Sequence, residues 1–194
     1  MNFLAHAYLS FGNPGLLAGN MISDFVKGKK KFDYPPAIQQ GIVLHREIDN
    51  YTDNHPVTKI AKAIFQPDYR LYSGALTDVI YDHFLAIDST AFAPVGLLDF
   101  TEEVYRTLEP MLPAFPEKFQ QIFPYMRDQN WLNNYQFGWG IRNSLAGVVR
   151  RSAWLTESDT AFRLFNDHFD ELAACYHSFF PDLENFVIAS LPRG

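Results

Sequence analysis

Signals that begin and end helices recur along the whole chain, and they restrict its fold more than any other feature. Asn13-Pro14, Pro35-Pro36 and Pro56 each stand before a stretch whose apolar residues repeat every three or four positions. Asparagine caps helices well, and proline fits the first helical position because its missing N–H has no partner to lose there. Alternating apolar and polar runs, which indicate strands, are nearly absent. The sequence therefore predicts an all-α protein.

The same pattern predicts a set of helices whose ends are set by proline, glycine or a capping residue. The expected segments run from Asn13 to about Gly28, from Pro36 to Asn54, from Pro56 onward, and over Ser73–Ile87, Asp99–Leu112, Pro116–Phe123, Gly140–Arg151 and Ser158–Phe179. No repeat, low-complexity tract or long polar linker divides the chain. We expect one helical bundle domain spanning residues 1–194.

The composition excludes several classes of protein. Acidic residues outnumber basic ones by 22 to 16 in the 194-residue chain, and the net charge of −6 argues against general nucleic-acid binding, which needs a basic surface. A single cysteine, Cys175, excludes an internal disulfide and fits a reducing compartment, so a cytoplasmic location is expected. The first 23 residues carry no Asp, Glu, Lys or Arg, but polar residues and Gly12-Asn13-Pro14-Gly15 interrupt them. We predict a buried segment there, and no membrane anchor.

Histidine and aspartate side chains are concentrated in the first 83 residues at helical spacing. Residues four apart project from one face of a helix, so each expected helix can offer its polar side chains together. These side chains are His45, Asp49 and Asp53 on one expected helix, Asp78, Asp82 and His83 on another, and Asn20 and Asp24 on a third, with His6 near the start. A bundle could gather them into one site with mixed nitrogen and oxygen ligands, which suits Mn, Fe, Zn or Mg.

Simpler interpretations of these residues stay open. Asp49, Asp53 or Asp78, taken alone, is also explained by an exposed helix position or a local cap. His6 and His83 are equally explained as hydrogen-bonded core histidines, although the Asp82-His83 pair needs a partner if it is buried. The chain has no Gly-x-Ser-x-Gly turn, no P-loop, no dinucleotide-binding glycine pattern and no Glu-x-x-His motif. Nucleophilic, nucleotide-fold and di-iron enzymes are therefore disfavoured.

Positive charge gathers at Lys27, Lys29, Lys30 and Lys31, directly after Asp24. A run of charge can simply be a solvated loop. On a chain of net negative charge, however, a basic patch beside a metal pocket would attract an acidic partner locally without general polyanion binding.

Four segments together resemble the bacterial acyl carrier protein phosphodiesterase family. They are Met1-Asn2-Phe3-Leu4-Ala5-His6, the stretch from Gly19 to Gly28, the stretch from Gly41 to Asn54, and Asp78 to Phe84. The resemblance spans most of the chain and is strongest over the first 85 residues. It implies a manganese-dependent enzyme that hydrolyses the phosphodiester between 4′-phosphopantetheine and a serine of the acidic acyl carrier protein. It also implies a divergent HD-type phosphohydrolase fold, although this chain has no His-Asp dipeptide.

The resemblance and the residue pattern together suggest roles for individual side chains. We expect a divalent metal, Mn²⁺ or another, to be held by side chains drawn from three segments, and carboxylates beside it to orient a ligand or activate water. The expected metal ligands are Asp24, His45, Asp82 and His83, with His6 as a fifth candidate; the expected catalytic carboxylates are Asp24, Asp49 and Asp78. The expected contacts to the carrier protein are Lys27, Lys29, Lys30, Lys31 and Arg46.

Two other functions fit the same sequence. One is a metal phosphohydrolase of similar fold that acts on a nucleotide or another phosphoester, since a fold does not determine its substrate. The other is a helical binding module, without catalytic activity, whose His and Asp residues hold a structural metal or only form hydrogen bonds.

Overall fold

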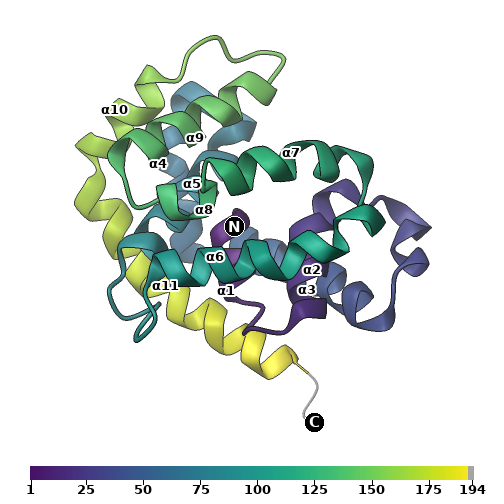
Figure 1. Cartoon of the computed structure of the whole chain (residues 1–194). Helices are drawn as coiled ribbons and strands as arrows, with labels where there is room; N and C mark the ends of the chain where they lie inside the picture. Colours follow the sequence, from purple (N-terminus) through teal and green to yellow (C-terminus); the bar gives the residue numbers. More distant parts are fainter. Residues whose placement is uncertain (192–194) are drawn as a thin grey trace.

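The asparagine and prolines placed before apolar stretches begin helices in the computed structural model, which describes residues 1–191. The Asn13 side chain accepts hydrogen bonds from the amides of Gly15 and Leu16 at 3.0 and 3.1 Å, and Pro14 is the first residue of α2 (Pro14–Ile22). Prolines also begin α3 (Pro36–Asn54) and α4 (Pro56–Tyr69). Within residues 1–191 no strand is present, so the prediction of a single all-α domain is confirmed (Figure 1).

The remaining elements follow one another closely along the chain. They are α1 (Phe3–Tyr8), η1 (Ser23–Phe25), η2 (Gly28–Asp33), η3 (Arg70–Tyr72), α5 (Ser73–Ile87), α6 (Leu97–Leu108), η4 (Glu109–Ala114), α7 (Glu117–Asp128), α8 (Trp131–Asn134), α9 (Gly138–Arg151), α10 (Asp159–Asp167) and α11 (Phe169–Ser190), where η marks a 3₁₀ helix. None of the helices in residues 1–191 has the length and apolar character of a transmembrane span. The expectation of an HD-like arrangement stays a prediction.

One predicted helix is wrong. The segment Ser158–Phe179 forms two helices, α10 and α11, which meet at His168, a half-buried residue whose ring contacts Glu171 at 3.0 Å. Both helices pack on α4, but α10 also lies on α9, whereas α11 also lies on α3 and α5. A single straight helix could not follow both surfaces. Similarly, α2 ends at Ile22 and the chain continues as the short η1 helix.

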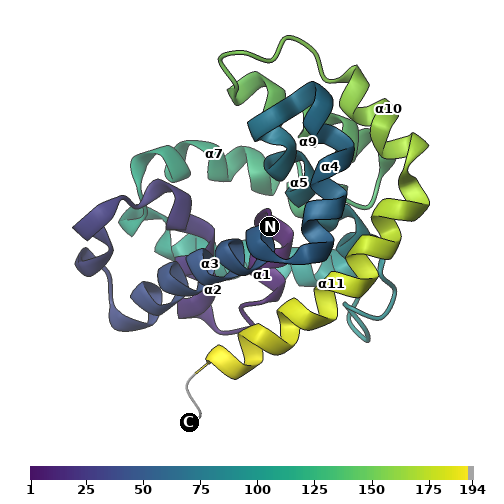
Figure 2. The ribbon, with the colours of Figure 1, turned by 180° about the vertical axis from the view of Figure 1, so that it is seen from behind.

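The N-terminal segment is buried at the centre of the domain, as its lack of charge predicts. Met1 is only 6% exposed, and α1 lies against α2 and α5. The start of the chain projects onto the middle of the molecule in both views, while α11 runs along one side of it (Figures 1 and 2). Because α1 has only six residues, it depends on its neighbours for stability. Its position matters because it carries His6.

The backbones of α2 and α3 lie in direct contact at two glycines. A Cβ atom on Gly19 would collide with the carbonyl oxygen of Ile38, and a Cβ atom on Gly41 would collide with that of Leu16. Glycine is therefore required at both positions, because any side chain would force the helices apart. This close approach places the end of α2 beside the middle of α3, where His45 lies.

Candidate metal centre

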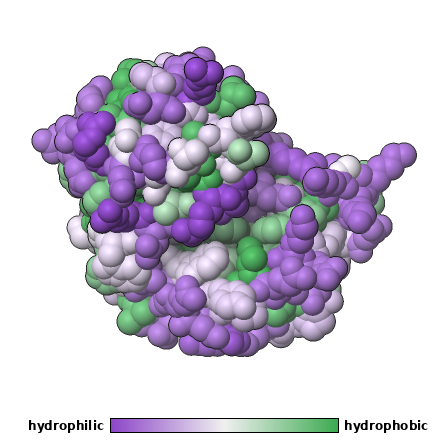
Figure 3. All heavy atoms as spheres, turned by 90° about the horizontal axis from the view of Figure 1, so that it is seen from above, coloured by the Kyte–Doolittle hydropathy of each residue, from purple (hydrophilic) through white to green (hydrophobic). Residues whose placement is uncertain are grey.

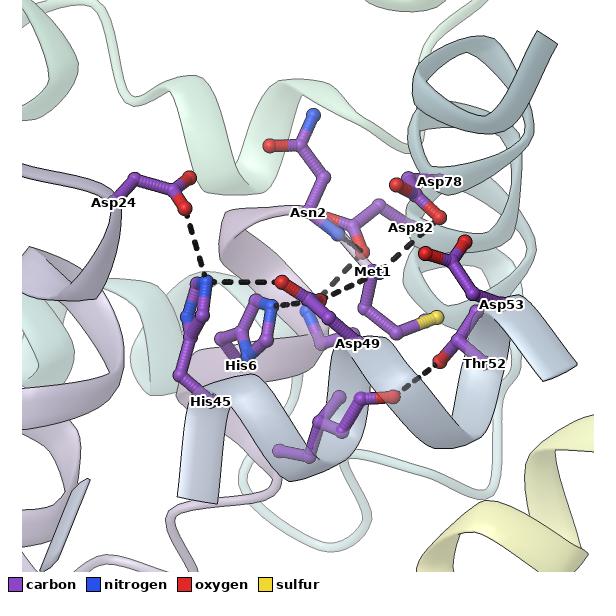
Figure 4. Close-up of polar contacts among 12 residues, drawn as sticks. Met1, Asn2, His6, Asp24, His45, Asp49, Thr52, Asp53, Asp78 and Asp82 are labelled. Carbon is purple, nitrogen blue, oxygen red and sulfur yellow. Dashed lines mark hydrogen bonds and ion pairs between the residues drawn. The ribbon is translucent and has the colours of Figure 1, made fainter. Parts of the chain in front are cut away.

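Two histidines and an aspartate converge between α1 and α3. The Nε2 atom of His6 lies 3.2 Å from one carboxylate oxygen of Asp49, and the Nε2 atom of His45 lies 3.2 Å from the other. Ligand atoms of these three residues all lie within 4.8 Å of one another (Figure 4). Imidazole nitrogens and a carboxylate at this spacing can hold a divalent cation such as Zn²⁺, Mn²⁺ or Fe²⁺.

Backbone contacts orient the two imidazoles. His45 and Asp49 stand one turn apart on α3, and the Nδ1 atom of His45 lies 2.8 Å from the carbonyl oxygen of Asn20. Since a carbonyl only accepts, Nδ1 carries the hydrogen and Nε2 faces the cluster. The His6 ring stacks on that of His45 with centroids 3.8 Å apart. Among the described residues the Nδ1 atom of His6 is buried without a hydrogen-bond partner, and its Nε2 atom faces the Asp49 carboxylate, so this ring can turn a nitrogen to a metal.

The protonation states reflect the crowding of these groups. Burial lowers the pKa of His6 to about 4, so its ring is neutral at pH 7. Burial opposes the charge of His45 as well, but contacts with Asp24 and Asp49 outweigh it and raise its pKa to about 9. Burial likewise opposes the Asp49 carboxylate, yet the two histidines hold its pKa well below the usual range. Without a metal, the His45 ring is therefore protonated at pH 7, and its positive charge stabilises the negative charges of Asp24 and Asp49.

Asp24 borders the cluster on its solvent side. It belongs to η1, and one carboxylate oxygen lies 3.2 Å from Nε2 of His45. This contact lowers the pKa of Asp24. The side chain is 71% exposed, so it can also reach a molecule that arrives from solvent.

The Met1 ammonium group occupies the side of the cluster opposite to Asp24. It lies 3.3 Å from Asp49 and 3.1 Å from Asp78 on α5. Burial disfavours its charge, but the carboxylates around it raise its pKa to about 10. Burial also raises the pKa of Asp78. Asp78 thus lies next to the three-residue cluster and is joined to it through the ammonium group.

Asp82 is fully buried and caps α1. Its carboxylate accepts hydrogen bonds from the backbone amides of Leu4 at 2.8 Å, Ala5 at 3.2 Å and Asn2 at 3.3 Å. A carboxylate at a helix N-terminus satisfies amides that have no partner within the helix. Burial nevertheless raises the pKa of Asp82 to about 7, although these hydrogen bonds act to lower it. The structure therefore gives Asp82 a positioning role, since it holds the helix that carries His6.

Two other candidates of the sequence analysis lie outside the cluster. The His83 ring packs against Phe165 and Phe169, and its Nδ1 atom lies 2.6 Å from the carbonyl oxygen of Tyr135. Asp53 is exposed and pairs with Lys62 on α4. Helical spacing identified the correct helices, but it could not show which side chains on each face turn toward one another.

The basic residues lie on one edge beside Asp24. Lys27, Lys29 and Lys30 are exposed, whereas Lys31 is half-buried with its ammonium group over the ring of Phe32, 5.1 Å from the centroid. This segment lies at the right-hand end of the molecule in Figure 1, and a hydrophilic projection extends on the same side in Figure 3. The Arg46 guanidinium donates to the carbonyl oxygen of Val26 at 3.0 Å, which ties the segment to α3.

Comparisons with known proteins identify the family of the chain. The family model "Acyl carrier protein phosphodiesterase" matches residues 1–183. The chain belongs to this family. Proteins of the same name are 35% identical in Yersinia pestis, 34% in Photorhabdus laumondii and 33% in Klebsiella pneumoniae, over 93–94% of this chain and 92–95% of theirs. No solved structure matches the chain. The family that the N-terminal motifs predicted is therefore confirmed.

The sequence analysis missed one feature of this family member, the ammonium group between Asp49 and Asp78. No sequence motif signals it, because the amine belongs to the backbone and the two carboxylates are distant from it in sequence.

Proposed function

We propose that this chain hydrolyses the phosphodiester that joins 4′-phosphopantetheine to a serine of acyl carrier protein. The observation that carries the proposal is the convergence of His6, His45 and Asp49 in a chain whose relatives are named for this phosphodiesterase activity. Those names favour the carrier protein over a nucleotide as the substrate. The same names describe an enzyme, so they also disfavour a binding module without catalytic activity.

We propose Mn²⁺, or another divalent ion, as the cofactor held by these three residues. The buried imidazole of His6 and the mixed nitrogen and oxygen donor set support the fit. When bound, such an ion polarises a phosphoryl oxygen and makes water more acidic. His83 is not included in the proposed set, because its ring packs among phenylalanines.

The reaction requires one bond to phosphorus to form and one to break. A water oxygen becomes bonded to phosphorus, the bond from phosphorus to the serine oxygen breaks, and that oxygen ends with a proton from the water. The phosphoryl group leaves on pantetheine. We assign Asp24 to the orientation of the attacking water, because its carboxylate is exposed and borders the cluster beside His45. Asp49 positions both imidazoles, and Asp78 positions Asp49 through the ammonium group.

The acidic carrier protein is proposed to bind against the basic edge formed by Lys27, Lys29, Lys30, Lys31 and Arg46. These residues begin three positions after Asp24, so a partner bound there would present its serine close to the cluster. Opposite charge at this edge would speed association and orient the partner, and added salt would weaken it.

The test is an incubation of the purified chain with holo acyl carrier protein, with Mn²⁺ or with chelator, followed by intact-protein mass spectrometry. We expect the apo form to accumulate only when metal is present. His45→Ala should abolish the conversion, while His177→Ala, which removes an exposed histidine on α11, should leave it unchanged. Persistence of the holo form with every divalent metal, from a folded sample, would refute the proposal.

A further inference from the structure

A cavity of about 280 Å³ lies beside the metal centre, between the start of the chain, α8 and α9. Asn2 lines the cavity, and its backbone amide donates to Asp82, which caps the helix that carries His6. The adjacent residue, Met1, contacts Asp49 of the cluster. Figure 3 shows the face on which α7 and α9 lie, and a hollow crosses the middle of it. The cavity and the centre are thus connected through Met1 and Asn2, the two residues that precede α1.

The cavity differs chemically from the metal centre. Its lining contains no Asp or Glu, whereas the centre contains Asp49 and is bordered by Asp24. Trp131 and Trp139 provide flat apolar surface, and both are partly exposed. Side chains that donate and accept neutral hydrogen bonds lie among them, including Asn143 and Ser144 on α9. Such a lining suits an uncharged ligand that has several amide groups and short apolar segments.

Two arginines on the last turn of α9 give the lining a positive charge. Arg150 and Arg151 are both exposed at the cavity. Positive charge beside the centre suits a ligand whose neutral chain is attached to an anionic phosphodiester.

We propose that this cavity binds the pantetheine arm of the substrate while the phosphodiester lies at the metal centre. The inference rests on the proposed function, which supplies the identity of the arm. Pantetheine is a narrow, uncharged chain with two amides, a hydroxyl and a geminal dimethyl group, and these groups match the amide side chains and indole faces of the lining. The cavity volume of about 280 Å³ is just below the roughly 300–1,000 Å³ typical of ligand pockets, which suits a narrow chain.

This arrangement assigns the two halves of the substrate to different sides of the centre. The carrier protein contacts the basic edge beside Asp24, and the arm enters the cavity beside Asn2. The arm then contributes binding energy remote from the reacting bond, and it fixes the direction in which phosphorus faces the centre.

Gly147 offers a way to block the cavity without removing any contact. It lies on α9 in the lining, and a Cβ atom there would approach only the tip of the Arg150 side chain, at 3.7 Å. Gly147→Met therefore places a side chain in the space proposed for the arm. Gly147→Ala is the matched control, because it adds one methyl group and favours the helix.

The first experiment compares two substrates. Trp139→Ala and Gly147→Met should each raise KM for holo acyl carrier protein about tenfold, ~1.4 kcal/mol. Hydrolysis of bis(4-nitrophenyl) phosphate, which has no pantetheine arm, should remain unchanged. Trp154→Ala is the control for loss of an exposed tryptophan, since Trp154 is 84% exposed and does not line the cavity. Unchanged KM values in both cavity variants, with native melting temperatures, would overturn the proposal.

The second experiment separates this proposal from the proposed function. Free pantetheine is titrated into the metal-loaded protein and binding is followed by ligand-observed NMR, which needs no catalysis. We expect binding that Gly147→Met weakens at least tenfold and Gly147→Ala does not. If holo carrier protein is not cleaved but pantetheine binds in this pattern, the proposed function fails and the cavity assignment survives. If the carrier protein is cleaved and pantetheine does not bind, the cavity assignment fails alone.

Discussion

Asp82→Ala should destabilise the protein, because it removes the cap of α1. The amides of Leu4 and Ala5 lose their only acceptor and stay buried. Each buried unpaired polar group costs roughly 1–3 kcal/mol. Burial of the carboxylate is itself unfavourable, as its raised pKa indicates, and offsets part of this loss. We expect a net loss of about 3 kcal/mol, which lowers the melting temperature by about 6–12 °C in a domain of this size.

Thermal and urea unfolding of the metal-free protein provide the measurement. Asp82→Asn should cost less than Asp82→Ala, because the amide oxygen can still accept one of the backbone N–H groups. Thr77→Val is the control on the same helix: Thr77 is fully buried, but its hydroxyl bonds only the carbonyl oxygen of Ser73 at 2.9 Å. Thr77→Val should lower the free energy of unfolding by about 1 kcal/mol.

Asp82→Ala should also weaken metal binding, since Asp82 holds α1 and α1 carries His6. Calorimetric titration with Mn²⁺ at a temperature where both proteins are folded would show this effect. An Asp82→Ala protein that melts within about 1 °C of the unchanged protein, less than the shift expected for 1 kcal/mol, would refute the role of Asp82 as a cap.

Three further predictions concern charge and packing. In the metal-free protein the raised pKa of His45 stabilises the fold below pH 6.5, and this stabilisation is lost as the pH rises toward 9. A metal ion that binds His45 must displace the proton on its imidazole, so calorimetry in two buffers should detect about one proton released per ion at pH 7.5. Gly41→Ala should lower the melting temperature by several degrees, because its Cβ would meet backbone atoms of α2; an unchanged value would contradict that close contact. Lys29→Glu with Lys30→Glu should raise KM for the carrier protein at low salt and flatten its salt dependence, whereas Lys59→Glu on α4 should not.

Capping signals and helical spacing, which depend on neighbouring residues, predicted most helices but only part of the candidate site. Asn13 and Pro56 mark helix starts that depend on nearby residues alone, so the sequence sufficed. The break at His168 depends on which helices the segments before and after it pack against, and no glycine or proline at this position indicates it in the sequence. For the same reason the spacing of Asp82 and His83 suggested metal ligands, yet their surroundings are the amides of α1 and a cluster of aromatic rings. Contacts between residues distant in sequence decide these roles.

The candidate metal centre combines residues that are close together in the sequence with a helix that is held by a residue far away in the sequence. Asp24, His45 and Asp49 lie within a short span and are brought together by the contact of α2 with α3, which needs only a small loop to close. The attachment of α1 depends instead on Asp82, 78 residues beyond Leu4. Because contacts that close small loops form earlier during folding, the α3 half of the centre should assemble first, with His6 completing it after α5 has docked. A metal ion captured by the early half could then act as a template on which the start of the chain folds.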